Sequence, residues 1–187
     1  MSAVRLLVLG AVRRRGCAHG YQVRSDLESW GAHEWSTAAP GSIYHALKSM
    51  AGRGLLAVHE EAASDAGGPP RIEYELTAEG EAAYFSLLRE ALSGRDDKLD
   101  ELTAAVGLID DLPRAEAIEL LHKRAEAMDL WLRSIREHVP TDANLDEWGP
   151  VGEVIGLWTT TARTRAEWTR GLISRLEGGA FTMADER

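Results

Sequence analysis

The sequence predicts a mainly α-helical protein with one small two-stranded β hairpin. Three observations support this fold class. Apolar residues recur at helical spacing through the first fifty residues, two alternating stretches flank a Gly- and Pro-rich segment, and helical spacing then resumes. A hairpin directly after a third helix is typical of a winged helix-turn-helix, here followed by a helical C-terminal region.

Two helices are expected before residue 31. Residues 4–12 are strongly apolar and precede a basic run at 13–15 and Gly16, which is a typical helix end. The segment HGYQVRSDLESWG, residues 19–31, has apolar side chains at near-helical spacing, which predicts the second helix. Those side chains are Tyr21, Val23, Leu27 and Trp30.

The third helix is expected to begin at Pro40, whose fixed φ suits a first helical turn. Ile43, Leu47 and Met50 recur at helical spacing, so they define the face that packs against the core. The opposite face is available to a partner. Gly54 is placed to end the helix in a left-handed conformation.

The hairpin is expected between residues 56 and 76. Its two stretches alternate as half-buried strands do, and the segment AASDAGGPP at 62–70 cannot continue a strand. Thr77 is placed to cap a following helix that runs to about Leu92. The alternating residues are Leu56, Val58, Ile72, Tyr74 and Leu76.

These motifs resemble, in order, those of the PadR family of bacterial transcriptional regulators. The matching pieces are LLVLGAV, HGYQV, GSIYHALKSMAGRGLL and GGPPRIEYELTAEG, and together they cover about the first eighty residues. RAEWTRGLISRLE, residues 165–177, resembles more loosely the family's longer C-terminal type. One departure is Ala39, where the family tends to have Ser or Thr, so Thr37 or Ser36 is expected to cap the third helix instead.

The exposed side of the third helix is the predicted DNA-reading surface. Ser42, His45 and Lys48 are the candidates for base edges or nearby phosphates in a major groove. For His45 the alternative is an exposed imidazole without a role. Tyr44 resembles the family's Tyr at this place, and it is either partly core or a phosphate contact through its hydroxyl.

Phosphate contacts are expected on both sides of that helix. Arg71 would hold a phosphate from the wing and Arg53 from the helix end. His19 and Gly20 open the second helix, whose N-terminal amides can also meet a phosphate. The run at residues 13–15 is better explained as a solvated helix end.

Net charge alone disfavours nucleic acid, because the chain carries −9 at neutral pH. The distribution of charge reduces this objection. Residues 1–80 carry eight Lys and Arg against nine Asp and Glu, whereas residues 81–187 carry thirteen against twenty-one. A small basic face on a nearly neutral domain is sufficient when two copies act together.

The chain divides, on this interpretation, into a winged helix-turn-helix at residues 1–80, a helical dimerisation and effector-binding region at 81–180 and a disordered tail at 181–187. From Ile118 to Val139 apolar residues step by three and four without a break, which indicates helices packed lengthwise. A monomer would leave much of this apolar surface uncovered, so a homodimer on a palindromic operator is expected.

The resemblance implies a repressor released by a small effector, often aromatic or drug-like. Met128, Trp131, Trp158 and Trp168 are the candidates for lining such a pocket, since Trp and Met stack on planar ligands. The alternative is that they are only core and interface.

Other function classes are less well supported. The six His residues have no metal-ligand spacing and there is no Gly-rich phosphate loop, so no metal, cofactor, catalytic residue or enzyme activity is expected. No apolar run is long enough to span a membrane, and a cytoplasmic protein is expected. The competing function is a winged-helix module that binds protein; steep salt dependence would instead indicate DNA.

Overall fold

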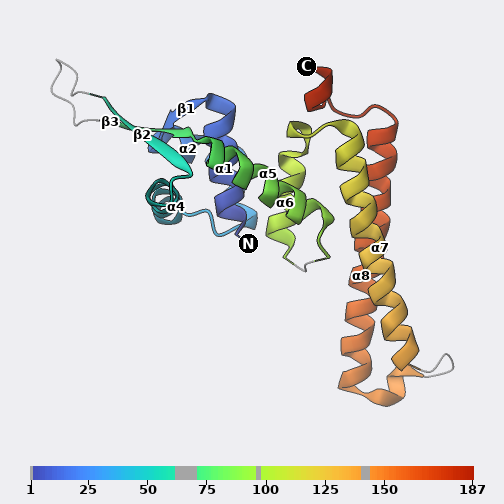
Figure 1. The fold of residues 1–187 in the computed structure, drawn as a ribbon. Helices are drawn as coiled ribbons and strands as arrows, with labels where there is room; N and C mark the ends of the chain where they lie inside the picture. Colours follow the sequence, from blue (N-terminus) through green and yellow to red (C-terminus); the bar gives the residue numbers. More distant parts are fainter. Residues whose placement is uncertain (1, 62–70, 96–97, 140–143) are drawn as a thin grey trace. The chain divides into compact units, whose positions relative to one another are not determined.

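The computed structural model describes residues 2–61, 71–95, 98–139 and 144–187 (Figure 1). The chain forms two compact units, one made of residues 1–91 and 98–108 and the other of residues 92–97 and 109–187. The expected boundary after residue 80 falls inside the helix Ala78–Ser93, whose residues 78–91 belong to the first unit. That helix stays with the first unit because Tyr84 and Leu88 are fully buried and Glu81 bonds to Arg13.

The first unit is mainly helical with a small antiparallel sheet, as the sequence predicts. Its elements are α1 (Ala3–Arg15), β1 (Cys17–His19), α2 (Gly20–Ser29), α3 (Ala32–Trp35), α4 (Pro40–Gly52), β2 (Leu56–Glu61), β3 (Arg71–Leu76), α5 (Ala78–Ser93) and α6 (Leu99–Gly107). The segment between the two strands of the wing, 62–70, lies outside the described residues.

The sheet has three strands in the order β1-β3-β2, one more than predicted. β2 and β3 form the predicted wing, with Leu56 opposite Leu76 and Val58 opposite Tyr74. β1 adds to the free edge of β3 and places Ala18 opposite Tyr74. Three residues are too few to show the alternation that predicts a strand, so β1 has no sequence signal of its own.

The core of this unit surrounds α1, whose residues 3–4 and 6–12 are all buried. α2, α4 and α6 pack on it, contributing Leu27, Ile43, Leu47 and Leu108. Helices buried on nearly all sides are apolar all round, which explains the continuous apolar run of α1.

The joint between α4 and the wing is a hydrogen-bonded turn. Gly54 has φ +74°, as predicted, and Leu55 N–H donates to the Met50 carbonyl at 3.0 Å. Thr77 caps α5, also as predicted: its hydroxyl accepts from Gly80 N–H at 3.0 Å and donates to the Gly54 carbonyl at 2.7 Å. The cap of α5 therefore also fixes the exit of α4.

The start of α4 differs from the expectation. Pro40 is the first helical residue, but Ala39 is the N-cap and no side chain caps the helix. The Ser36 hydroxyl accepts instead from Ala38 N–H, and the Thr37 carbonyl accepts from the Ser42 hydroxyl, so neither expected residue supplies a side-chain cap. The Ser42 hydroxyl holds this loop by donating to the carbonyls of Thr37 and Ala39.

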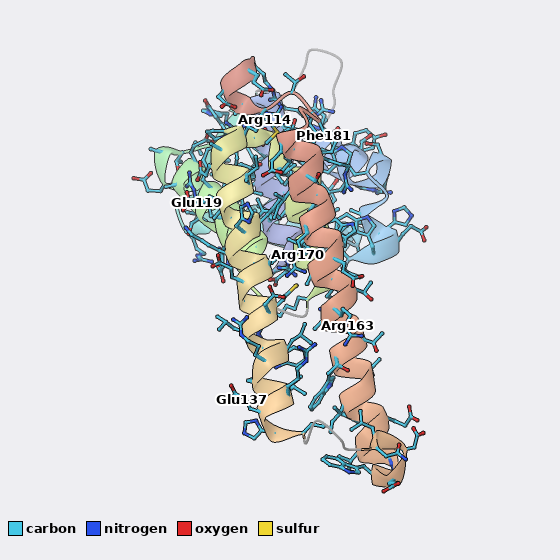
Figure 2. The ribbon with its side chains drawn as sticks, turned by 90° about the vertical axis from the view of Figure 1, so that its right-hand side faces the viewer. Arg114, Glu119, Glu137, Arg163, Arg170 and Phe181 are labelled. Atoms are coloured by element: carbon cyan, nitrogen blue, oxygen red, sulfur yellow. The ribbon has the colours of Figure 1, made fainter. Side chains whose placement is uncertain are left out.

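The second unit is dominated by two long helices that lie side by side, α7 (Arg114–His138) and α8 (Pro150–Glu177) (Figure 2). Three short 3₁₀ turns accompany them: η1 (Ile109–Asp111), η2 (Leu145–Trp148) and η3 (Ala184–Glu186). Arg170 of α8 reaches Asp129 of α7 at 2.5 Å, and Met128 of α7 and Ala166 of α8 are buried. No described helix has both the length and the apolar character needed to cross a membrane.

The tail at residues 181–187 is ordered, against the expectation of disorder. Met183 is fully buried, and Ala184 N–H donates to the Leu112 carbonyl at 3.2 Å. Arg114 closes the arrangement: its guanidinium donates to the carbonyls of Leu176, Ala180 and Phe181 and to both carboxylate oxygens of Glu186. A single arginine thus joins the last turn of α8, at the Leu176 carbonyl, to the segment that follows it.

Acid should loosen this tail before the rest of the unit. Hydrogen bonds from Arg114 and from the Met183 amide hold the pKa of Glu186 at about 2, against an ordinary 4.5. A lowered pKa stabilises the folded state above the ordinary value, and that stabilisation is lost as pH falls from 4.5 towards 2. The amide-exchange protection factors of residues 183–187, which correct for the intrinsic pH dependence of exchange, should therefore fall as pH is lowered over this range in the wild type. In Arg114→Gln they should be low at every pH, while Arg133→Gln should match the wild type.

Candidate nucleic-acid interface

The outward face of α4 carries the predicted DNA-reading side chains. Tyr44, His45 and Lys48 are exposed, whereas Ile43, Leu47 and Met50 on the opposite face are buried. Neither His45 nor Lys48 makes a hydrogen bond or ion pair with any described residue. These two side chains are therefore available to an external partner.

Tyr44 is positioned by Gly20 at the start of α2. A Cβ built on Gly20 would lie 2.5 Å from Tyr44 Cε1 and 3.0 Å from Cδ1, so only glycine admits the ring at this place. Gly20 itself is buried. One edge of the Tyr44 ring packs on Gly20, while 46% of the residue stays exposed.

His19 caps α2. Its Nδ1 accepts from Gln22 N–H at 3.3 Å, and the Gln22 side chain accepts from His19 N–H at 3.0 Å, a reciprocal pair that fixes the helix start. Acceptance at Nδ1 leaves Nε2 as the site of the ring proton.

A concavity of about 730 Å³ lies beside α4 on this flank. It is bounded by the start of α2, by Tyr44 and by β3, so three predicted contacts, His19, Gly20 and Tyr44, meet around one hollow beside the wing. Burial raises the pKa of Tyr74 in its wall, which keeps the phenol protonated as a hydrogen-bond donor. The lining residues are His19, Gly20, Tyr21, Gln22, Tyr44, Ile72 and Tyr74.

The three other predicted contacts, Ser42, Arg53 and Arg71, differ in their surroundings. Ser42 is half-buried and its hydroxyl proton is directed at the loop before α4, so it is a poorer donor to DNA than the sequence suggests. Arg53, just past α4, is exposed and makes no side-chain bond to a described residue. The backbone of Arg71 begins β3 opposite Glu61, but its side chain lies outside what the structure describes.

The three arginines at residues 13–15 contact other side chains of the first unit. Arg13 pairs with Glu81 at 2.8 Å, Arg15 with Asp26 at 2.6 Å, and Arg14 lies over the Trp30 ring. These contacts agree with the interpretation of the run as a helix end rather than as a DNA contact.

Arg5 is a cation that sequence reasoning did not select. It lies on α1 and lines a second hollow of about 280 Å³ on the other flank of α4, together with Ser42, His45 and Ser49. The sequence signal that could have identified Arg5 was a single charged residue, between Val4 and Leu6, within an otherwise apolar stretch.

The four residues predicted to line an effector pocket are not brought together. Trp158 lines a hollow of about 340 Å³ with Trp148, Ile135 and Ile155, but none of the other three does. Met128 is buried, Trp131 lies under the Arg95 guanidinium at 5.2 Å, and Trp168 is 41% exposed. Trp148 lies on the 3₁₀ turn η2.

One side of α8 carries exposed apolar residues, which we name the α8 stripe. They lie within about a third of the helix circumference, next to the side that packs on α7. The α8 stripe consists of Val151, Val154, Leu157, Trp158 and Trp168, which are 41–66% exposed.

Comparison with known proteins finds a family that the N-terminal part resembles. Residues 8–85 match the model of the transcriptional regulator PadR-like family. No curated protein sequence matches the chain.

Several solved structures are similar at low identity. Bacillus subtilis PadR in complex with operator DNA is 17% identical, with a TM-score of 0.42, over 92% of this chain and 98% of that one. The same protein in complex with p-coumaric acid is 17% identical, with a TM-score of 0.39, over 94% and 96%. A PadR family transcription regulator from Clostridium difficile is 24% identical, with a TM-score of 0.38, over 46% and 84%. Residues 8–85, which contain α2, α4 and the wing strands, are therefore similar to the transcriptional regulator PadR-like family.

Proposed function

We propose that this protein is a homodimeric repressor that binds a palindromic operator through α4 and the wing. The observation that carries the proposal is the outward face of α4, where Lys48 and His45 are exposed without partners in the described structure. A helix of this kind fits the major groove, with its exposed side chains facing the base edges. The family match over residues 8–85 supports the same assignment.

Cations that could meet phosphates surround this face. Arg53 follows the end of α4, and Arg71 begins β3 in the wing. The Tyr-lined hollow beside α4 offers phenol hydroxyls, which are ordinary donors to phosphate oxygens. DNA contact at these positions would be salt-dependent, because each neutralised phosphate releases bound counterions.

Lys48→Ala tests the assignment of α4. We expect operator affinity to fall about tenfold, and the slope of log affinity against log salt to decrease by about one, since one phosphate or base contact is removed. The matched control is Lys123→Ala, because Lys123 lies on α7 and pairs there with Glu119. Fluorescence anisotropy on DNA from the protein's own upstream region provides the measurement. An equal loss of operator affinity in both variants would mean that only net charge matters, which would contradict the assignment of α4.

The α8 stripe supports the proposed dimer. An exposed apolar strip of five large residues on one helix is the kind of surface that a second copy covers. Two copies related by a two-fold axis would set their α4 helices on half-sites about 34–36 Å apart, or a multiple of that spacing.

Effector control is the least constrained part of the proposal. The hollow between Trp148 and Trp158 is apolar, and it adjoins the α8 stripe through Trp158, so a planar aromatic ligand there could change how two copies associate. Adding planar aromatic compounds to the anisotropy titration tests this, because an effector would release DNA and quench tryptophan emission together. Release of DNA without a change in tryptophan emission would place the effector elsewhere.

A further inference from the structure

The hollow that contains Arg5 lies on the flank of α4 opposite the Tyr-lined hollow. Ser42 and Ser49 line it from α4, about 140–160° around the helix from Tyr44. Ser2 and Arg5 enter from α1, and Thr37 enters from the loop before α4. α4 therefore has a concave surface on each side of its outward face.

The chemistry of this hollow suits an anion. Its polar lining residues are Ser2, Arg5, Thr37, Ser42, His45 and Ser49, and none of the described lining residues is acidic. The Arg5 Nε is buried and has no hydrogen-bond partner among the described residues. A buried donor without an acceptor is costly, so a small movement of the Arg5 side chain toward an acceptor in the hollow would be favourable.

The position of this hollow beside α4 indicates which anion it would bind. When a helix enters a major groove about 12 Å wide, the two sugar-phosphate backbones run along its two flanks. The Tyr-lined hollow would face one backbone, and the Arg5 hollow would face the other. Arginine is well suited to phosphate because its planar guanidinium can donate two parallel hydrogen bonds.

We propose that Arg5 binds a backbone phosphate of the DNA strand on the flank of α4 away from the wing. This inference rests on the proposed DNA-binding function and adds a contact from α1 to it. Because the contact is to phosphate, it stabilises binding to any sequence and contributes no base preference.

The test uses the full chain and two unrelated duplexes of about 24 base pairs, with anisotropy measured between about 50 and 200 mM salt. In Arg5→Gln we expect affinity for both duplexes to fall about tenfold and the salt slope to decrease by about one. Arg5→Lys keeps the charge without the planar fork and should recover part of the affinity. The matched control is Arg89→Gln on α5, where the guanidinium lies over the Phe85 ring.

The outcomes separate this inference from the proposed function. Wild-type binding with an unchanged Arg5→Gln would overturn the Arg5 contact alone. A wild type that binds neither duplex even at low salt would overturn both. Thermal melts of each variant show whether the fold is intact. Arg5 would have a purely structural role if Arg5→Gln lost DNA affinity, Arg5→Lys failed to recover it, and the melting temperature fell.

Discussion

Gly80→Ala should lower the free energy of unfolding of the first unit by about 3 kcal/mol. A Cβ at this position would lie 2.0 Å from the backbone oxygen of Leu55 and 2.9 Å from Leu76 Cδ2. The clash is with backbone, so no side-chain rotation relieves it. Gly80 N–H also donates to the Thr77 hydroxyl, and the same Leu55 oxygen accepts from Thr77 N–H. The substitution therefore disturbs the joint between α4 and the wing.

Gly52→Ala is the control for this prediction. Gly52 is the last residue of α4, and a Cβ there would meet nothing within 4 Å. Alanine should leave stability unchanged or raise it by up to about 1 kcal/mol, because it is the better helix former. Urea unfolding of both variants gives the comparison. Equal stability of the two proteins would mean that α5 can move away from Leu55 at little cost.

Trp158→Glu should weaken self-association of the protein by about a hundredfold or more. Trp158 is 51% exposed in the isolated chain and lies in the middle of the α8 stripe, where a second copy would cover it. A carboxylate buried against an apolar partner surface has no compensating charge, and its desolvation opposes association. Operator affinity should fall as well, because two linked half-sites bind far more tightly than one.

Ser174→Glu is the matched control, since Ser174 is exposed on α8 roughly opposite the α8 stripe. It adds the same charge without touching the proposed interface, and it should remain dimeric in sedimentation velocity. If the wild type and Trp158→Glu sediment as the same species, whether monomer or dimer, the α8 stripe is not the dimer surface.

The elements with strong local signals were predictable from sequence. Pro40, Gly54 and Thr77 mark helix ends by backbone chemistry alone, and the structure places all three as expected. The wing followed from alternation on both sides of a Gly- and Pro-rich segment, and its register pairs Leu56 with Leu76. Such signals act over a few residues and need no knowledge of the rest of the fold.

Features that depend on contacts between distant residues were not predictable. β1 exists because β3 offers it an edge, and the tail is ordered because Arg114, about seventy residues earlier, binds its carbonyls. Neither contact leaves a periodic pattern. The same limit applies to the candidate site: spacing identified the exposed side chains of α4, but only packing revealed that Gly20 admits Tyr44 and that Arg5 lies beside Ser49.

One titration tests directly whether the outward face of α4 binds DNA as part of a dimer. Wild type, Lys48→Ala and Lys123→Ala would be compared on upstream DNA at two salt concentrations, with unlabelled competitor DNA present. We predict salt-sensitive, competitor-resistant binding by a dimer that Lys48→Ala weakens about tenfold and Lys123→Ala leaves intact. Binding that is insensitive to salt and to Lys48→Ala would contradict the claim and favour a winged-helix module that recognises protein instead.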